Sequence, residues 1–102
     1  ALTVNGVAAS AAGTSSASTT GTFTIGTRTA FADAQIGMGS TTLTRTSGPT
    51  CDALDPGTAT VITGSAPIAQ SGLAVGCHRY ELTGVNAAGL TSTISTSVIV
   101  GP

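Results

Sequence analysis

The stretch that decides the fold is Cys77–Val85, which reads CHRYELTGV, together with Thr91–Val100, which reads TSTISTSVIV. Side chains of a β-strand point alternately to opposite faces, so a strand covered on one side has an apolar residue at every second position. In the later segment this apolar parity holds Ile94, Val98 and Val100. In the earlier segment, one face has His78, Tyr80, Leu82 and Gly84, and the other has Cys77, Arg79, Glu81, Thr83 and Val85.

The connection between these two segments, Asn86–Gly89, contains residue types that tolerate the left-handed conformations of a hairpin tip. We therefore predict an antiparallel hairpin, which should be the most stable part of the domain. Shorter alternations lie upstream, and the pattern recurs about seven times between turn-forming clusters, which is typical of an all-β sandwich or barrel. The upstream alternations involve Leu2, Val4 and Val7, then Phe23 and Ile25, Thr41–Ser47 and Thr58–Thr63, with Asp55-Pro56-Gly57 as a turn and Pro67 at an edge.

Two segments lack a clear alternation. Ala8–Gly21 consists almost entirely of Ala, Ser, Thr and Gly, and we predict a loose edge or loop there. Ala30–Gly39 places Phe31, Ile36 and Met38 among glycines, and it fits a turn or a single helical turn better than a strand.

Composition limits the possible partners. The chain has 102 residues, which is the size of one domain, 1–102. Three Arg, no Lys and four acidic residues give a net charge of -1. Binding to nucleic acid and attachment to anionic membranes both need clustered positive charge, so neither is expected. No apolar run approaches the roughly 20 residues of a membrane-spanning helix.

Two cysteines in a Thr- and Ser-rich, weakly charged chain favour one disulfide, Cys51–Cys77, in a protein that works outside the reducing cytosol. The alternative is two reduced thiols buried as small apolar groups. A structural zinc site needs four ligands, which two cysteines and one histidine do not supply.

Residues that could support catalysis are few. Cys77 and His78 are consecutive in a strand, so their side chains should point to opposite faces and cannot form a nucleophile pair. No Gly-x-Ser-x-Gly motif occurs, and Gly37–Gly39 lacks the further residues of a phosphate-binding loop. Asp52 and Asp55 could hold calcium, but turn capping is the expected role. We predict no enzyme activity, no cofactor and no metal site.

The run Ser71–Gly89 resembles the penultimate strand and hairpin of bacterial immunoglobulin-like (Big-type) domains, with a Cys-x-Arg-Tyr-x-Leu-Thr strand at Cys77–Thr83 and a Thr/Val-rich closing strand at Thr93–Val100. The resemblance implies an immunoglobulin-like Greek-key β-sandwich of about seven antiparallel strands. It also implies that the Tyr80 hydroxyl closes a corner. The chain has no Trp, and Cys77 lies on the opposite parity from Tyr80, so a Cys51–Cys77 bridge would differ from the inter-sheet disulfide of antibody domains.

These features favour a non-enzymatic structural or adhesion module of a secreted or surface-exposed bacterial protein. The expected partners are neighbouring domains or copies of itself, because a surface of hydroxyls and methyls is cheap to desolvate. The alternative is a self-assembling subunit or decoration protein of an extracellular filament or phage virion. A glycan-binding module would need exposed aromatic side chains, and Phe23, Phe31 and Tyr80 are the only aromatic residues.

Overall fold

The computed structural model describes residues 1–29, 41–85, 89 and 91–101. This part of the chain contains strands and no helix. The strands are β1 Leu2–Val4, β2 Val7–Ala8, β3 Ser15–Ser18, β4 Phe23–Arg28, β5 Thr41–Gly48, β6 Asp55–Ile62, β7 Ile68–Gln70, β8 Gly76–Val85 and β9 Thr91–Val100.

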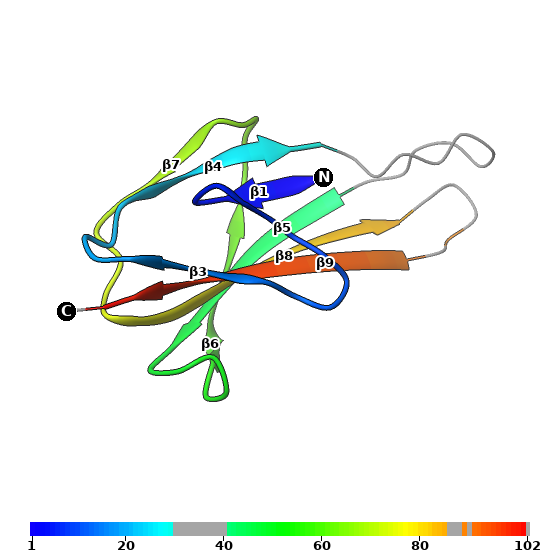
Figure 1. The fold of residues 1–102 in the computed structure, drawn as a ribbon. Helices are drawn as coiled ribbons and strands as arrows, with labels where there is room; N and C mark the ends of the chain where they lie inside the picture. The colour runs from blue at the N-terminus through cyan, green and yellow to red at the C-terminus, as the bar shows by residue number, and fades with distance from the viewer. Residues whose placement is uncertain (30–40, 86–88, 90, 102) are drawn as a thin grey trace.

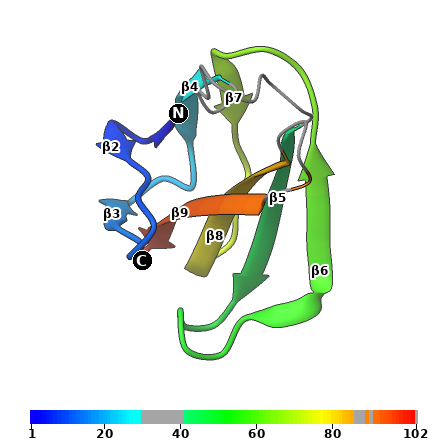
Figure 2. The same cartoon turned by 90° about the vertical axis from the view of Figure 1, so that its right-hand side faces the viewer.

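The strands form two stacked sheets, which confirms the predicted all-β sandwich (Figures 1 and 2). One sheet has the order β2-β1-β4-β7 and the other has the order β3-β9-β8-β5-β6. The chain changes sheet five times, between β2 and β3, β3 and β4, β4 and β5, β6 and β7, and β7 and β8. In the immunoglobulin fold, strands A, B and E lie side by side in one sheet, and C, F and G in the other. Here β1, β4 and β7 match the first set, and β5, β8 and β9 match the second.

The predicted hairpin is confirmed by the register of β8 and β9. All ten residues of each strand pair antiparallel, from Gly76 opposite Val100 to Val85 opposite Thr91. On the other side of β8, all eight residues of β5 pair with it, from Thr41 opposite Gly84 to Gly48 opposite Cys77. The predicted parity is also confirmed, because His78, Tyr80 and Leu82 are buried while the residues between them are partly exposed. β8 is therefore the central strand on which the larger sheet is built.

The N-terminal region differs from the prediction in strand number and direction. The described residues contain nine strands rather than about seven, because Val7–Ala8 forms a strand of its own, β2, and the Ala8–Gly21 segment supplies β3. β3 runs parallel to β9, so the sandwich is not wholly antiparallel. The segment has no apolar alternation because β3 is a short edge strand with no buried residue. Backbone pairing with β9, from Ser15 opposite Ser97 to Ser18 opposite Val100, holds it in place.

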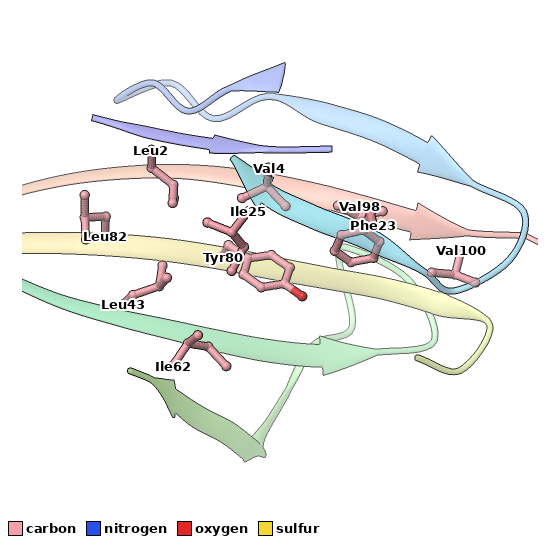
Figure 3. Packing of buried hydrophobic residues seen from close by; sticks show 10 residues of the cluster. All are labelled: Leu2, Val4, Phe23, Ile25, Leu43, Ile62, Tyr80, Leu82, Val98 and Val100. Carbon is pink, nitrogen blue, oxygen red and sulfur yellow. The ribbon is translucent and has the colours of Figure 1, made fainter. Parts of the chain in front are cut away.

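The hydrophobic core lies between the sheets and centres on Tyr80, which has no exposed surface (Figure 3). The ring of Phe23 meets the Tyr80 ring edge to face, with centroids 5.9 Å apart and planes at 86°. Such a pair contributes about 0.5–1.5 kcal/mol beyond the area that it buries. The other members of the core are Leu2, Val4, Ile25, Leu43, Ile62, Leu82, Val98 and Val100.

Two polar side chains tie the sheets together near their margins. Arg28 at the end of β4 donates from Nη1 to the carbonyl oxygen of Ile62 at the end of β6, at 2.6 Å. Asn5, in the turn between β1 and β2, donates from Nδ2 to the carbonyl oxygen of Ala17 in β3, at 3.0 Å. These bonds fix the margins of the two sheets against each other.

Some predicted boundaries differ from the observed ones. β6 begins at Asp55, so the predicted turn Asp55-Pro56-Gly57 belongs to the strand. The pairing with β5 is irregular between Arg45 and Ser47, and this irregularity admits the proline and glycine. Pro67 directly precedes the edge strand β7, as predicted. The predicted turn at Ala30–Gly39, which includes Gly37–Gly39, and most of the hairpin tip Asn86–Gly89 lie outside the described residues.

Thr96 is a polar residue inside the core. It shares the parity of Val98, is fully buried, and its hydroxyl has no hydrogen-bond partner among the described residues. Valine has nearly the same shape without the hydroxyl. We expect Thr96→Val to raise the free energy of unfolding by about 1 kcal/mol, since it removes an unsatisfied buried group. Urea denaturation measures the change.

The matched control is Thr93→Val, three residues earlier on the exposed side of β9. It should change stability by less than about 0.5 kcal/mol. Equal effects of the two substitutions, or a loss of stability in Thr96→Val, would contradict the prediction.

Candidate functional site

A disulfide joins Cys51 to Cys77, as predicted, with Cα atoms 5.1 Å apart. Cys51 lies in the connection that follows β5, and Cys77 is the second residue of β8. The bridge therefore links the end of β5 to its neighbour β8 within the five-stranded sheet. The immunoglobulin disulfide instead connects the two sheets through the core. The expected difference from antibody domains, based on the parity of Cys77, is confirmed.

Two glycines allow the backbone to pack tightly beside this bridge. A Cβ atom on Gly48 would lie 2.2 Å from the carbonyl oxygen of Ala53, and one on Gly76 would lie 2.4 Å from the carbonyl oxygen of Gly48. Gly76 also has φ 140°, which side chains rarely allow. The strand ends and the disulfide connection thus form one close-packed unit, which we call the disulfide corner.

His78 is the only histidine in the chain, and it is buried behind the disulfide corner with 5% of its surface exposed. Its Nε2 lies 2.7 Å from the carbonyl oxygen of Ala74, and its Nδ1 lies 2.7 Å from the hydroxyl of Ser47. A carbonyl only accepts, so Nε2 carries a hydrogen, and in the neutral ring Nδ1 accepts from Ser47. The imidazole therefore closes the connection between β7 and β8.

This role of His78 corrects the expectation for Tyr80. The resemblance to immunoglobulin-like domains gave corner closure to the Tyr80 hydroxyl, which in those folds bonds backbone just upstream. Here the backbone bond belongs to His78, because Tyr80 lies two residues further along β8 and points between the sheets. The partner Ser47 was missed, although its parity with Leu43 in β5 could have indicated that it faces inward.

The Tyr80 hydroxyl instead belongs to a network that crosses the core. It donates to Oε1 of Gln70 in β7 at 2.8 Å. The same oxygen accepts from Nη1 of Arg45 in β5, also at 2.8 Å. Gln70 is 7% exposed and belongs to the opposite sheet from its two donors. One amide oxygen thus satisfies a buried hydroxyl and a guanidinium, and joins the two layers.

Burial raises the pKa of Tyr80 from 10.0 to about 12, and the hydrogen bond and positive charge of Arg45 offset part of this rise. A folded-state pKa above the unfolded value means that the stabilisation is complete below pH 10 and is lost as the pH rises through 12. The chain has no lysine and one tyrosine, and both cysteines are in the disulfide. Tyr80 is therefore the side chain expected to titrate in this window.

We expect tyrosinate absorbance of the folded protein to develop with a midpoint near pH 12, and in urea near pH 10. The free energy of unfolding should fall between pH 10 and pH 12, and in Tyr80→Phe it should not change over this range. A folded-state midpoint equal to the one in urea would show that the hydroxyl is solvated rather than buried.

The predicted turn-capping role of Asp55 is supported by geometry. Its Oδ1 accepts from the backbone N–H of Gly57 at 2.9 Å, and its carbonyl oxygen accepts from the Thr58 hydroxyl at 2.7 Å. Asp52 is exposed in the preceding connection. Among the described residues, no group of three or more His, Cys, Asp or Glu side chains is placed to hold a metal ion.

A shallow groove of about 540 Å³ lies on the outer side of the five-stranded sheet, beside the disulfide corner. Arg79 is the one charged side chain among the groove residues, and its Nη2 lies 3.5 Å from the carbonyl oxygen of Cys51. The rest of the lining is uncharged and mostly hydroxyl-bearing or small. It includes Gly13, Thr14, Ser15, Ser95, Ser97 and Ile99.

None of the described segments forms a helix that is long and apolar enough to cross a membrane. Phe23 and Tyr80 are both buried, so they provide no exposed platform for stacking a sugar ring. Phe31 lies outside the described residues. Comparisons of the chain with protein-family models, with curated proteins and with solved structures find no match.

Proposed function

We propose that the chain is a non-enzymatic structural module, a spacer or adhesion unit, of a secreted or surface-exposed bacterial protein. The observation that carries the proposal is the disulfide corner, where a covalent bridge locks neighbouring strands of a sandwich with a thin core. Disulfides persist in oxidising compartments and are rare in the cytosol. A bridge of this kind is consistent with a protein that must stay folded outside the cell.

The chemistry of the described residues supports a structural role over a catalytic one. Both ring nitrogens of His78 are engaged in hydrogen bonds, and both sulfurs are oxidised. The Tyr80 hydroxyl is buried in a satisfied network. The groups that most often act as nucleophiles or general bases thus serve to hold the fold together.

The path of the chain fits a spacer. Ala1 hydrogen-bonds to Thr29 next to the end of β4, whereas Gly101 bonds to Ser18 at the end of β3. Figure 1 shows the C-terminus at one end of the long dimension, which measures 46 Å, and the N-terminus partway along it, displaced toward the other end. Modules joined through these points would extend along that dimension.

A fusion of two copies, with Gly101 of the first joined to Ala1 of the second by a short linker, tests the spacer role. Small-angle X-ray scattering should give a maximum dimension clearly greater than the 46 Å length of one module. A particle no longer than a single module would contradict the proposal. In parallel, material exported to a bacterial periplasm should contain the bridge, and free thiols in that material would contradict the proposed compartment.

The second candidate is a self-assembling subunit of an extracellular filament or virion, and β6 favours it. β6 is an eight-residue strand at the edge of the larger sheet, and all of its residues from Asp55 to Val61 are exposed. Past Asp55 the strand has no charge, and Val61 is 59% exposed. An uncharged edge of this length can add a strand from another chain. Light scattering separates the two candidates. Particles whose size keeps increasing with concentration would favour the self-assembling subunit over the spacer module.

A further inference from the structure

The outer face of the five-stranded sheet, which we define as the side chains of β5, β8 and β9 that point away from the core, is almost uncharged. Arg79 and Glu81 are its only charged residues, two positions apart on the central strand β8. Both are partly exposed. The hydroxyl-bearing residues around them are Thr42, Thr44, Thr46, Thr83, Thr91, Thr93, Ser95 and Ser97, of which Ser97 is buried, and the face is completed by Gly48, Cys77, Val85 and Ile99.

The register places these residues in rows across the sheet. Each row holds one residue from β5, one from β8 and one from β9, and the two central rows each contain one charge flanked by two hydroxyls. The basic row is Thr46, Arg79 and Ser97, and the acidic row is Thr44, Glu81 and Ser95.

The Arg79 guanidinium extends toward the disulfide corner, where Nη2 lies 3.5 Å from the Cys51 carbonyl oxygen. Cys51 is bonded to Cys77, on the far side of Arg79 from Glu81, so the guanidinium leans away from the acidic row. A contact of 3.5 Å is at the long limit of a hydrogen bond, so the donors of the guanidinium fork remain available. The groove beside it has room for a carboxylate.

We infer that the outer face binds the outer face of a second copy of this chain through a two-fold axis that runs across the strands at the level of Tyr80. Such an axis reverses the strand direction and places the basic row of each copy over the acidic row of the other. Arg79 then faces Glu81 of the second copy, and the same pair forms again on the other side of the axis. The row of Thr42, Thr83 and Thr93 in each copy then faces the row of Gly48, Cys77 and Ile99 in the other.

Charge complementarity identifies the second copy as the occupant. The face holds one positive and one negative charge on neighbouring rows, so it is complementary to itself after a half-turn. A nucleic acid or an acidic peptide would bring several negative charges toward Glu81. Like charges placed opposite each other in an interface are strongly unfavourable.

The area agrees with a weak dimer. Strands lie about 4.8 Å apart and rise about 3.3 Å per residue, so an overlap of eight residues over the three strands β5, β8 and β9 covers roughly 380 Å² on each copy. Two such faces bury about 760 Å², which is below the size of a standard interface and fits only a weak, transient association. The hydroxyl and methyl groups cost little to desolvate, and we expect association in the micromolar range.

This inference deepens the proposed structural role by naming its partner, and it rests on that role. Sedimentation equilibrium of the wild-type chain should show a monomer–dimer equilibrium that weakens with salt, because partly exposed ion pairs are screened. A chain that remains monomeric at about 1 mM, the weak end of measurable association, would overturn it. An extended two-module fusion together with a monomeric chain would leave the spacer role intact and remove only this inference.

Charge reversal tests the pairing directly. Arg79→Glu makes the two central rows acidic and Glu81→Arg makes them basic, so each variant alone should dimerise at least about tenfold more weakly, because like charges then face each other. A mixture of the two variants should form a heterodimer. The double variant Arg79→Glu/Glu81→Arg should dimerise like the wild type, since the exchanged charges remain complementary.

The matched control is Thr24→Glu, which adds a charge at an exposed position of β4 in the opposite sheet and should leave the association unchanged. Circular dichroism of every variant confirms that the fold is retained. Dimerisation of the single reversals at wild-type strength, or no association in their mixture, would overturn the proposed axis.

Discussion

Replacing both Cys51 and Cys77 with serine should lower the free energy of unfolding by about 3 kcal/mol, because the bridge closes a loop of 26 residues and restricts the unfolded chain. The loss should be large relative to total stability, since folded domains are typically stable by only about 5–15 kcal/mol. Urea denaturation monitored by circular dichroism measures it.

The wild-type chain in reducing buffer is the control, and it should unfold near the midpoint of the double serine variant. The far-ultraviolet spectrum of the folded variant should match the wild type, because the bridge joins strands that are already hydrogen-bonded neighbours. A midpoint in oxidised wild type no higher than in reduced wild type would show that the bridge adds no stability.

Gln70→Leu should cost about 2–3 kcal/mol, although leucine is similar in size and apolar. The substitution removes the one oxygen that accepts from both Tyr80 and Arg45. A buried hydroxyl and a part-buried guanidinium then lose their partner, and unsatisfied buried groups cost about 1–3 kcal/mol each. Denaturation in urea gives the loss.

Tyr80→Phe is the matched variant, because it deletes one donor and leaves Gln70 bonded to Arg45. We expect a smaller cost, about 1 kcal/mol. The double variant Gln70→Leu/Tyr80→Phe should be less destabilised than the sum of the two single variants, since the second change removes a hydroxyl already left without a partner. Simple additivity would show that the three side chains do not act as one network.

The larger sheet could be predicted from sequence because its information is local. Alternation in Cys77–Val85 and Thr91–Val100 fixes which side chains are buried, and that parity also placed Cys77 away from the core. Thr96 shares the parity of Val98, so its burial could have been found in the same way. A polar residue at an apolar position was the available signal.

The rest depends on contacts between distant segments. Ser15–Ser18 forms a strand because β9 offers an open edge, and nothing in its own residues indicates a parallel partner. Gln70 lies in a three-residue strand, which is too short for a pattern, and its role depends on Arg45 25 residues away. Likewise, His78 rather than Tyr80 closes the connection between β7 and β8, because the Ala74 carbonyl oxygen lies within hydrogen-bond distance of the imidazole.

The first eighteen residues contribute to both layers, with β1 against β4 in one and β3 against β9 in the other. Removing this segment would leave β4 and β9 as edge strands with one side unpaired, one in each of the two sheets that enclose the core. A fusion or display design should therefore keep these N-terminal residues. A shortened chain would expose an unpaired strand edge on each sheet and would be prone to exchange strands with other molecules.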